Sequence, residues 1–329
     1  MRWQVFFWVL PVAAGLAALC LGRYPVPFGE VLAAITEIFT GVETVAPLTR
    51  MTLWNLRLPR ILLAALAGAG LSCAGCAFQS LFANPLATPD TLGVASGASF
   101  GAALGLLLGL PLLGVQSMAM VMGALAVALT WLGSTGKHKG MSTVVLSGIM
   151  MGSLFTALVS LVKFLADEES QLPAITYWLM GGLHNAAYET LLPGAIPIVL
   201  GILVLWLLRW RMNLLPLSED EARASGVSIA ALRAITVVCA TAITAACVAL
   251  CGQVGWVGLL VPHICRMKFG SNHLSLLPAA IGTGAAFLIA VDTAARSISA
   301  QEIPISILTA LIGAPFFILL MRRNGGWQL

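Results

Sequence analysis

Few side chains in this sequence have the type and spacing that chemistry requires. Cys73 and Cys76 have the CxxC spacing of a redox pair or of half a zinc site, but neither a second CxxC motif nor a nearby histidine accompanies them. His263 follows Pro262 in an apolar stretch and has no further ligand at metal-binding spacing. We therefore expect the two cysteines to serve helix packing, and we assign no metal ligand.

The sequence also lacks the motifs of nucleotide and metalloenzyme chemistry. It contains neither GxxxxGK[ST] nor HExxH, so we expect no catalytic residue, no cofactor bound by this chain, and no ATP hydrolysis by the chain alone. Asp292 is the clear acid within an apolar run, and Arg296 follows at the spacing of an i,i+4 ion pair. The pair is predicted to be structural and to lie near the outer surface.

The composition indicates a membrane protein. Of 329 residues, 59% are hydrophobic and 9% are charged, whereas soluble domains average about 25% charged residues. The mean hydropathy of +0.97 means that lipid must surround most of the chain. The 17 lysines and arginines form no basic run that could follow phosphates, which argues against nucleic acid as a partner.

Apolar runs bounded by proline, glycine and charge predict a single all-α transmembrane domain over residues 1–329. A shorter apolar segment at 172–183 is broken by Pro173 and by Gly181 and Gly182, and it predicts a re-entrant or interfacial helix. The ten expected spans, of which the eighth is short, lie at 3–22, 57–82, 91–110, 115–134, 142–165, 190–209, 230–251, 256–268, 275–296 and 305–321.

The basic residues predict the orientation. If Arg2 is cytoplasmic, alternation of ten spans places eleven of the 17 lysines and arginines on the same side. Because cytoplasmic loops carry an excess of Lys and Arg, we expect both termini to be cytoplasmic.

Several motifs follow one another along the chain. They are LRLPR at 56–60, QSLFANPLATPD at 79–90, LGVASGA at 92–98, YWLMGG at 177–182, GWVGLLVPHICR at 255–266, IP at 303–304 and TALIGAPFF at 309–317. In this order, from about residue 50 to 323, the sequence resembles the permease subunits of binding-protein-dependent ABC importers for iron-siderophore, haem and vitamin B12.

The resemblance implies a fold like that of the vitamin B12 importer permease and a transporter subunit rather than an enzyme. It implies a homodimer or close heterodimer in the cytoplasmic (inner) membrane of a prokaryote, with membrane lipid around it. Two ATP-binding cassette subunits would hold ATP and Mg, and a substrate-binding protein would deliver an iron chelate, haem or cobalamin for ATP-driven alternating access. The alternatives are a secondary transporter without an ATPase and a membrane-embedded enzyme; this chain mostly lacks their buried ion-coupling acid or polar cluster.

Residues 215–226 predict a short cytoplasmic helix. Ser218 and Glu221 form a capping box, acids occupy the first turn, and Gly226 provides a stop. By itself this pattern is that of an ordinary surface helix. The resemblance implies that it is the coupling helix that sits in a cleft of the ATPase subunit, formed by Leu217, Ser218, Glu219, Asp220, Glu221, Arg223 and Gly226.

Two prolines predict a sharp turn after the second span. Pro85 and Pro89 each remove a backbone donor and favour extended geometry in the preceding residue, so the segment cannot stay helical. The resemblance places this turn and the start of the fifth span at the cytoplasmic mouth of the pathway. It makes Asn84, Leu86, Ser142 and Thr143 gate candidates, although a plain turn and an N-cap pair would also explain these residues.

Three arginines are expected at the outer face. Arg57 and Arg60 are spaced i,i+3, so on a helix they share one side and should point together at the water. The resemblance implies that these two and Arg296 receive acidic side chains from the binding protein, for which a guanidinium is well suited. The alternative is that they are interfacial side chains whose charged ends reach the headgroup region.

Overall fold

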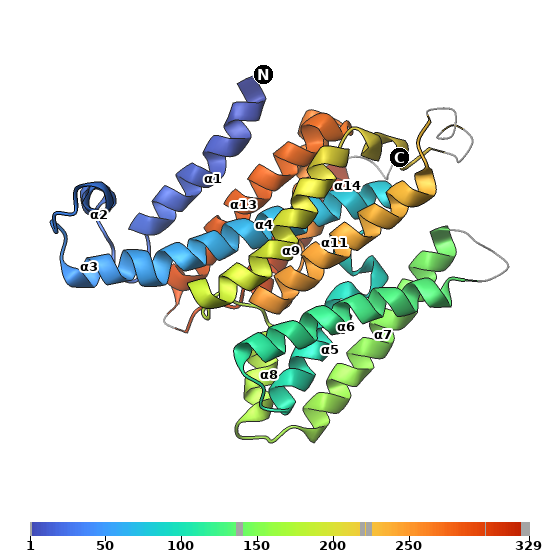
Figure 1. Cartoon of the computed structure of the whole chain (residues 1–329), viewed down its shortest axis with the longest axis horizontal. Coiled ribbons are helices and arrows are strands. Elements are labelled where there is room, and N and C mark those ends of the chain that lie inside the picture. Colours follow the sequence, from blue (N-terminus) through green and yellow to red (C-terminus); the bar gives the residue numbers. More distant parts are fainter. Residues whose placement is uncertain (1, 136–140, 218–220, 222–225, 300, 324–329) are drawn as a thin grey trace.

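In a computed structural model, the protein is described for residues 2–135, 141–217, 221, 226–299 and 301–323. Regular structure in these ranges is helical throughout, which confirms the expected all-α class (Figure 1). Each predicted span corresponds to one described helix, and apart from the start of the second span the bounds differ by a few residues. The helices are α1 Arg2–Cys20, α4 Leu58–Leu81, α5 Val94–Leu107, α6 Leu112–Gly133, α7 Met141–Leu165, α9 Tyr188–Leu208, α11 Ile229–Cys251, α12 Val257–Phe269, α13 His273–Ile298 and α14 Ile305–Arg323.

Length and composition sort these helices further. Among the described residues, six helical segments are long and apolar enough to cross a membrane, and shorter apolar helices lie at Phe7–Cys20, Val94–Leu107 and Ile305–Leu320. The short eighth span is the 13-residue α12. The expected interfacial helix is α8, Gln171–Leu179, which ends just before Gly181 adopts a left-handed φ of 71°.

The second span begins earlier than the sequence predicted. Helix α3, Pro47–Met51, continues through the π-helical turn η1, Thr52–Arg57, into α4 without a break. The π turn ends two residues before Pro59, whose backbone nitrogen has no hydrogen to donate to the preceding turn. Single π turns of this kind occur mostly inside α-helices. The prediction that this span starts at residue 57 is therefore wrong, because the continuous helix begins at Pro47.

Helix α2, Phe28–Thr40, was not predicted. It buries Val31 and Ala34 and exposes Phe28 and Phe39. At 13 residues it is too short to span a bilayer. It is an amphipathic helix beside the start of α3 (Figure 1).

Helix α4 forms the centre of the fold, with α1 and α13 on one side and α9 and α11 on the other (Figure 1). Glycines permit its closest contacts. A Cβ on Gly68 would lie 2.2 Å from the carbonyl oxygen of Gly284 in α13, and one on Gly75 would lie 1.8 Å from that of Gly258 in α12. The small residues along α4 thus allow backbone-to-backbone packing, as helices in lipid require.

The cysteines serve this packing, as the sequence predicted. Cys73 and Cys76 are fully buried on α4, and all seven cysteines are free thiols. Cys247 of α11 also contacts α4, with its Sγ 3.8 Å from the carbonyl oxygen of Ala67.

The helix ends form two faces of opposite character. Phe7 near the start of α1 contacts Phe269 at the end of α12, while Ala18 near the end of α1 accepts a hydrogen bond from Arg296 near the end of α13. We call the first end the basic face; it carries Arg209, Arg211, Arg266, Lys268 and Arg322. We call the other the acidic face; it carries Glu30, Glu37, Glu43, Asp167, Glu168, Glu169, Glu189 and Glu302.

Candidate pathway and coupling sites

A polar cleft with a volume of about 700 Å³ opens at the basic face. The end of α4 and the turn after it provide one wall, the segment 213–216 a second, and the turn between α12 and α13 a third. The cleft therefore places the predicted gate residue Asn84 beside the segment that leads into the predicted coupling helix. Its lining is Gln79, Ser80, Ala83, Asn84, Pro85, Asn213, Pro216, Arg266, Ser271, Asn272 and His273.

The turn after α4 is as sharp as its prolines predicted. Ala83 has a left-handed φ of 46°, and the Asn84 side chain accepts a hydrogen bond from the backbone N–H of Leu86 at 2.9 Å. Asn84 and Leu86 are exposed. A fixed turn is thus confirmed, and its role as a gate stays a prediction.

The other two gate candidates, Ser142 and Thr143, open helix α7. Two turns further on, α7 packs against η2, Pro89–Leu92, where a Cβ on Gly148 would lie 2.1 Å from the carbonyl oxygen of Thr91. The helix that Ser142 and Thr143 open thus contacts the same short 3-10 turn that follows Asn84 and Leu86 in the sequence.

Only part of the predicted coupling helix belongs to the described residues. Leu217 is half-buried, and Glu221 has helical backbone and is exposed. Gly226 has a φ of 70°, the left-handed conformation of a helix stop. Ser218, Glu219, Asp220 and Arg223 lie outside the described residues, so the helix there stays a prediction.

At the acidic face, Arg60 joins two acids. Its Nε lies 2.9 Å and 3.0 Å from the Oδ1 and Oδ2 atoms of Asp292, and its Nη1 lies 2.9 Å from Glu302 Oε2. Asp292 pairs more weakly with Arg296, at 3.8 Å. The expected Asp292–Arg296 pair is present, but Arg60 is the principal partner.

The prediction that Arg57 and Arg60 point together at the water is wrong. Arg57 is 4% exposed and donates to the carbonyl oxygens of Leu19 and Tyr24, and Arg296 is 8% exposed and donates to that of Ala18. These two arginines therefore satisfy carbonyl groups at the C-terminal end of α1, where a positive charge also complements the helix dipole. The two arginines still reach the same region, since Arg57 lies beside Arg296 and Arg60 binds Asp292, both on α13, but that region is protein and not water.

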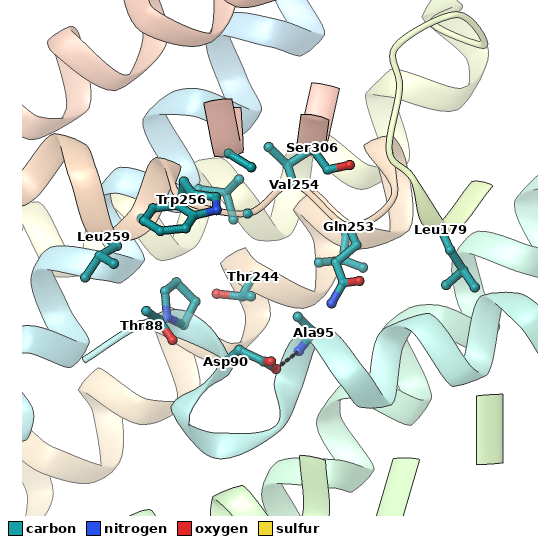
Figure 2. A pocket seen from close by; sticks show the side chains of 16 residues that line it. Thr88, Asp90, Ala95, Leu179, Thr244, Gln253, Val254, Trp256, Leu259 and Ser306 are labelled. Carbon is teal, nitrogen blue, oxygen red and sulfur yellow. Dashed lines mark hydrogen bonds between the residues drawn. The ribbon is translucent and has the colours of Figure 1, made fainter. Parts of the chain in front are cut away.

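A second cavity, of about 530 Å³, lies within the membrane-spanning part (Figure 2). Its polar lining comes mainly from hydroxyl and amide groups on Thr88, Thr244, Gln253 and Ser306. Trp256 covers one side and has a left-handed φ of 67°. Asp90 is the ionisable side chain among the lining residues.

Asp90 at this cavity is a residue that the sequence analysis missed. Its Oδ1 accepts hydrogen bonds from the backbone N–H groups of Ala95 and Ser96, at 3.1 Å and 3.2 Å (Figure 2 draws the first). The carboxylate thus caps α5, which the acid just before a helix could have indicated. Glu302, also missed, has no such local signal, because its partner is 242 residues away.

The fold and these sites define a polytopic membrane permease in which transport, and not catalysis, is the task. The model of the FecCD transport family matches residues 10–323. The chain belongs to this family and is a permease subunit of an ABC importer, not an enzyme. This assignment does not favour the secondary-transporter alternative.

Three similar proteins illustrate the family. The molybdate import system permease protein MolB of Haemophilus influenzae is 40% identical over 96% of this chain and 95% of its own length. The vitamin B12 import system permease protein BtuC of Klebsiella pneumoniae is 34% identical, over 99% and 95%. A solved transporter of metal-chelate ABC type in an inward-facing conformation is 39% identical, covers 98% of this chain and 99% of its own, and superposes with a TM-score of 0.88.

Proposed function

We propose that this chain passes a metal-containing solute inward across a prokaryotic cytoplasmic membrane by ATP-driven alternating access. The observation that carries the proposal is the cleft at the basic face, where the turn after α4 meets the segment leading into residues 217–226. A partner ATPase subunit that contacts residues 217–226 would favour one of two packings of the helices at the pathway mouth when it binds ATP.

The proposed assembly contains two permease copies, two ATPase subunits and a binding protein. Its pathway lies between the two copies. Exposed apolar side chains on α7 and α14, such as Met150, Leu154 and Leu311, support an additional apolar contact outside this chain, with the second copy or with lipid. The basic face is the cytoplasmic one in this proposal, so both α1 and α14 have their chain termini in the cytoplasm.

For the solute, we propose an iron chelate, haem or cobalamin. The cavity lining supports a bulky chelate that passes without tight binding, because its polar side chains are hydroxyl and amide groups apart from Asp90, whose carboxylate is already bonded to the backbone of α5. A second candidate is an oxyanion of the molybdate class, which the 40% identity with the MolB permease favours.

Uptake into vesicles tests both candidates. The permease is reconstituted with its ATPase and binding protein, and the vesicles receive a ferric siderophore, haem, cobalamin or molybdate. We expect ATP-dependent uptake of one of the chelates; uptake of molybdate alone would select the second candidate. Uptake without any ATPase subunit would overturn the proposal.

Charge reversal tests the coupling role of residues 215–226. Glu219→Lys with Glu221→Lys places cations where an acidic helix is proposed to meet a complementary ATPase cleft. Uptake should fall steeply while the permease still inserts in the membrane. Unchanged uptake and unchanged substrate-stimulated ATPase activity would remove the coupling role.

The orientation is tested by labelling intact cells. A cysteine in place of Arg322, at the end of α14, should not react with a membrane-impermeant maleimide. Labelling there would reverse the proposed topology.

A further inference from the structure

Three polar side chains that line the cleft of the basic face form a hydrogen-bonded chain, in which Ser80 and His273 are buried and Asn213 is half-buried. The Nδ1 atom of His273 lies 2.9 Å from the Oδ1 atom of Asn213, and its Nε2 atom is hydrogen-bonded to the Oγ atom of Ser80. His273 and Ser80 are each only 4% exposed. We call this set the Asn213–His273–Ser80 chain.

The partners define the direction of each hydrogen bond. Asn213 Oδ1 also accepts from the backbone N–H of His273 at 2.9 Å, and its Nδ2 donates to Asn272 Oδ1 at 3.2 Å. With Oδ1 as acceptor, His273 Nδ1 must carry the proton, so Nε2 of the neutral ring accepts from the Ser80 hydroxyl. Each described polar atom of the imidazole then has a partner.

The chain connects three separate elements. Asn213 belongs to η3, Arg211–Leu214, which leads into the predicted coupling helix. His273 begins α13, and Ser80 lies in the last turn of α4, three residues before the left-handed Ala83. A single imidazole therefore bridges the segment before residues 217–226 and the turn that holds Asn84 and Leu86.

Capping of α13 does not require this imidazole. Asn272 is the N-cap residue, and its Oδ1 accepts from the backbone N–H of Leu274 at 3.0 Å. The histidine ring is directed instead to two other elements, one on each side of the cleft.

We propose that His273 is a positioning residue that transmits movement from the coupling segment to the turn after α4. The inference rests on the proposed function. Apolar contacts can slide over one another, but separating a buried hydrogen-bonded group leaves an unpaired donor or acceptor, at a cost of about 1–3 kcal/mol for each. The ends of η3, α13 and α4 therefore shift together when an ATPase moves the coupling segment.

Variants of this chain should change the number of substrate molecules transported per ATP hydrolysed. Ser80→Ala removes the hydroxyl that ties the imidazole to α4, and His273→Phe keeps a ring but removes both nitrogens. We expect each variant, reconstituted with ATPase and binding protein, to lower this ratio by about tenfold, which corresponds to the loss of one buried hydrogen bond. If His273→Phe does not fold, Ser80→Ala carries the test.

Ser275→Ala is the matched control. Its hydroxyl also lies at the start of α13, but it bonds only within the turn between α12 and α13, to Phe269 and Asn272. The ratio should stay at the wild-type value in this variant. An equal decrease in Ser275→Ala would overturn the inference.

A double variant separates transmission from simple stability. If one chain carries the movement, Ser80→Ala with Asn213→Ala should be no worse in transport per ATP than the worse single variant. A wild-type ratio in the single variants, with only a lower melting temperature, would leave His273 a structural residue and overturn the inference. Absence of ATP-dependent uptake by the wild-type complex would instead overturn the proposed function.

Discussion

Arg60 and Asp292 join α4 to α13 with the geometry of a buried ion pair. Arg60 Nη2 lies 2.8 Å from Asp292 Oδ1, and the side chains are 12% and 2% exposed. The same guanidinium holds Glu302, whose backbone has a left-handed φ of 43°. One arginine thus connects two helices and the loop that precedes α14.

Asp292→Asn should destabilise the protein strongly. The change leaves a largely buried guanidinium with only the more exposed Glu302 as its acid, and breaking such a pair costs about 3 kcal/mol. Thermal unfolding of the purified permease in detergent measures the effect. Glu302→Gln is the control, because its carboxylate is 28% exposed and its loss should cost about 1 kcal/mol or less. Equal effects of the two changes would contradict this ranking.

Glu302→Gln should also strengthen association with the binding protein if Arg60 is a docking residue. Docking at Arg57, Arg60 and Arg296 stays a prediction, and in this structure a carboxylate that approaches Arg60 must compete with Glu302. Titration of the binding protein against the permease in nanodiscs should give a lower Kd for Glu302→Gln and a higher Kd for Arg60→Glu. Unchanged Kd values for both would show that Arg60 acts only within the chain.

Glu37→Ala should open the loop between α2 and α3. The Glu37 carboxylate accepts hydrogen bonds from the backbone N–H groups of Thr44 and Val45 and pairs with Arg50 at 3.0 Å. Hydrogen exchange of these two amides should become about tenfold faster or more. Glu43→Ala is the control, since Glu43 contacts Arg50 from an exposed position.

The same loop should resist acid. The Arg50 side chain and then the Val45 amide lower the pKa of Glu37 to about 2. Because this pKa is depressed in the folded protein, the stabilisation is present above the unfolded value of about 4.3 and is lost only as the pH falls through the folded value. Amide protection should therefore persist at pH 4 and disappear near pH 2; loss already at pH 4 would contradict the assignment.

Gly75→Ala should impair folding, whereas Gly29→Ala should not. The added methyl group would meet the backbone of α12 at 1.8 Å in the first case and nothing within 4 Å in the second. Overpacking against a backbone that cannot move aside costs about 3 kcal/mol or more. The yield of monodisperse protein after detergent extraction, compared for the two variants, measures the difference.

The sequence was a good guide to the spans, because long apolar runs between charges leave few alternative helix ends. It failed where the determining contact is tertiary. Helix α2 is too short and too mixed in composition to register as a span, and the π turn before Pro59 depends on backbone geometry that spacing alone does not encode.

The site residues were likewise predictable where the determining contact is local and not where it is tertiary. The turn around Asn84 was predictable, because proline acts locally. The surroundings of Arg57 and Arg296 were not, because the groups they bind belong to α1, far away in the sequence. The position of His273 was not predictable either, since its two partners lie 60 and 193 residues away.

The glycine contacts of α4 also limit which parts of the molecule can change shape. Where backbones touch at Gly68 and Gly284 and at Gly75 and Gly258, no side chain lies between them to adjust. Helices α4, α12 and α13 therefore behave as one rigid body, and the turn with Asn84 is attached to the end of this body. Helix α7 buries only 17% of its apolar window within the chain, and its close backbone contact is with η2, where Gly148 meets Thr91. Opening at the basic face then becomes a displacement of this rigid body, with the Asn84 turn at its end, relative to Ser142 and Thr143 on α7.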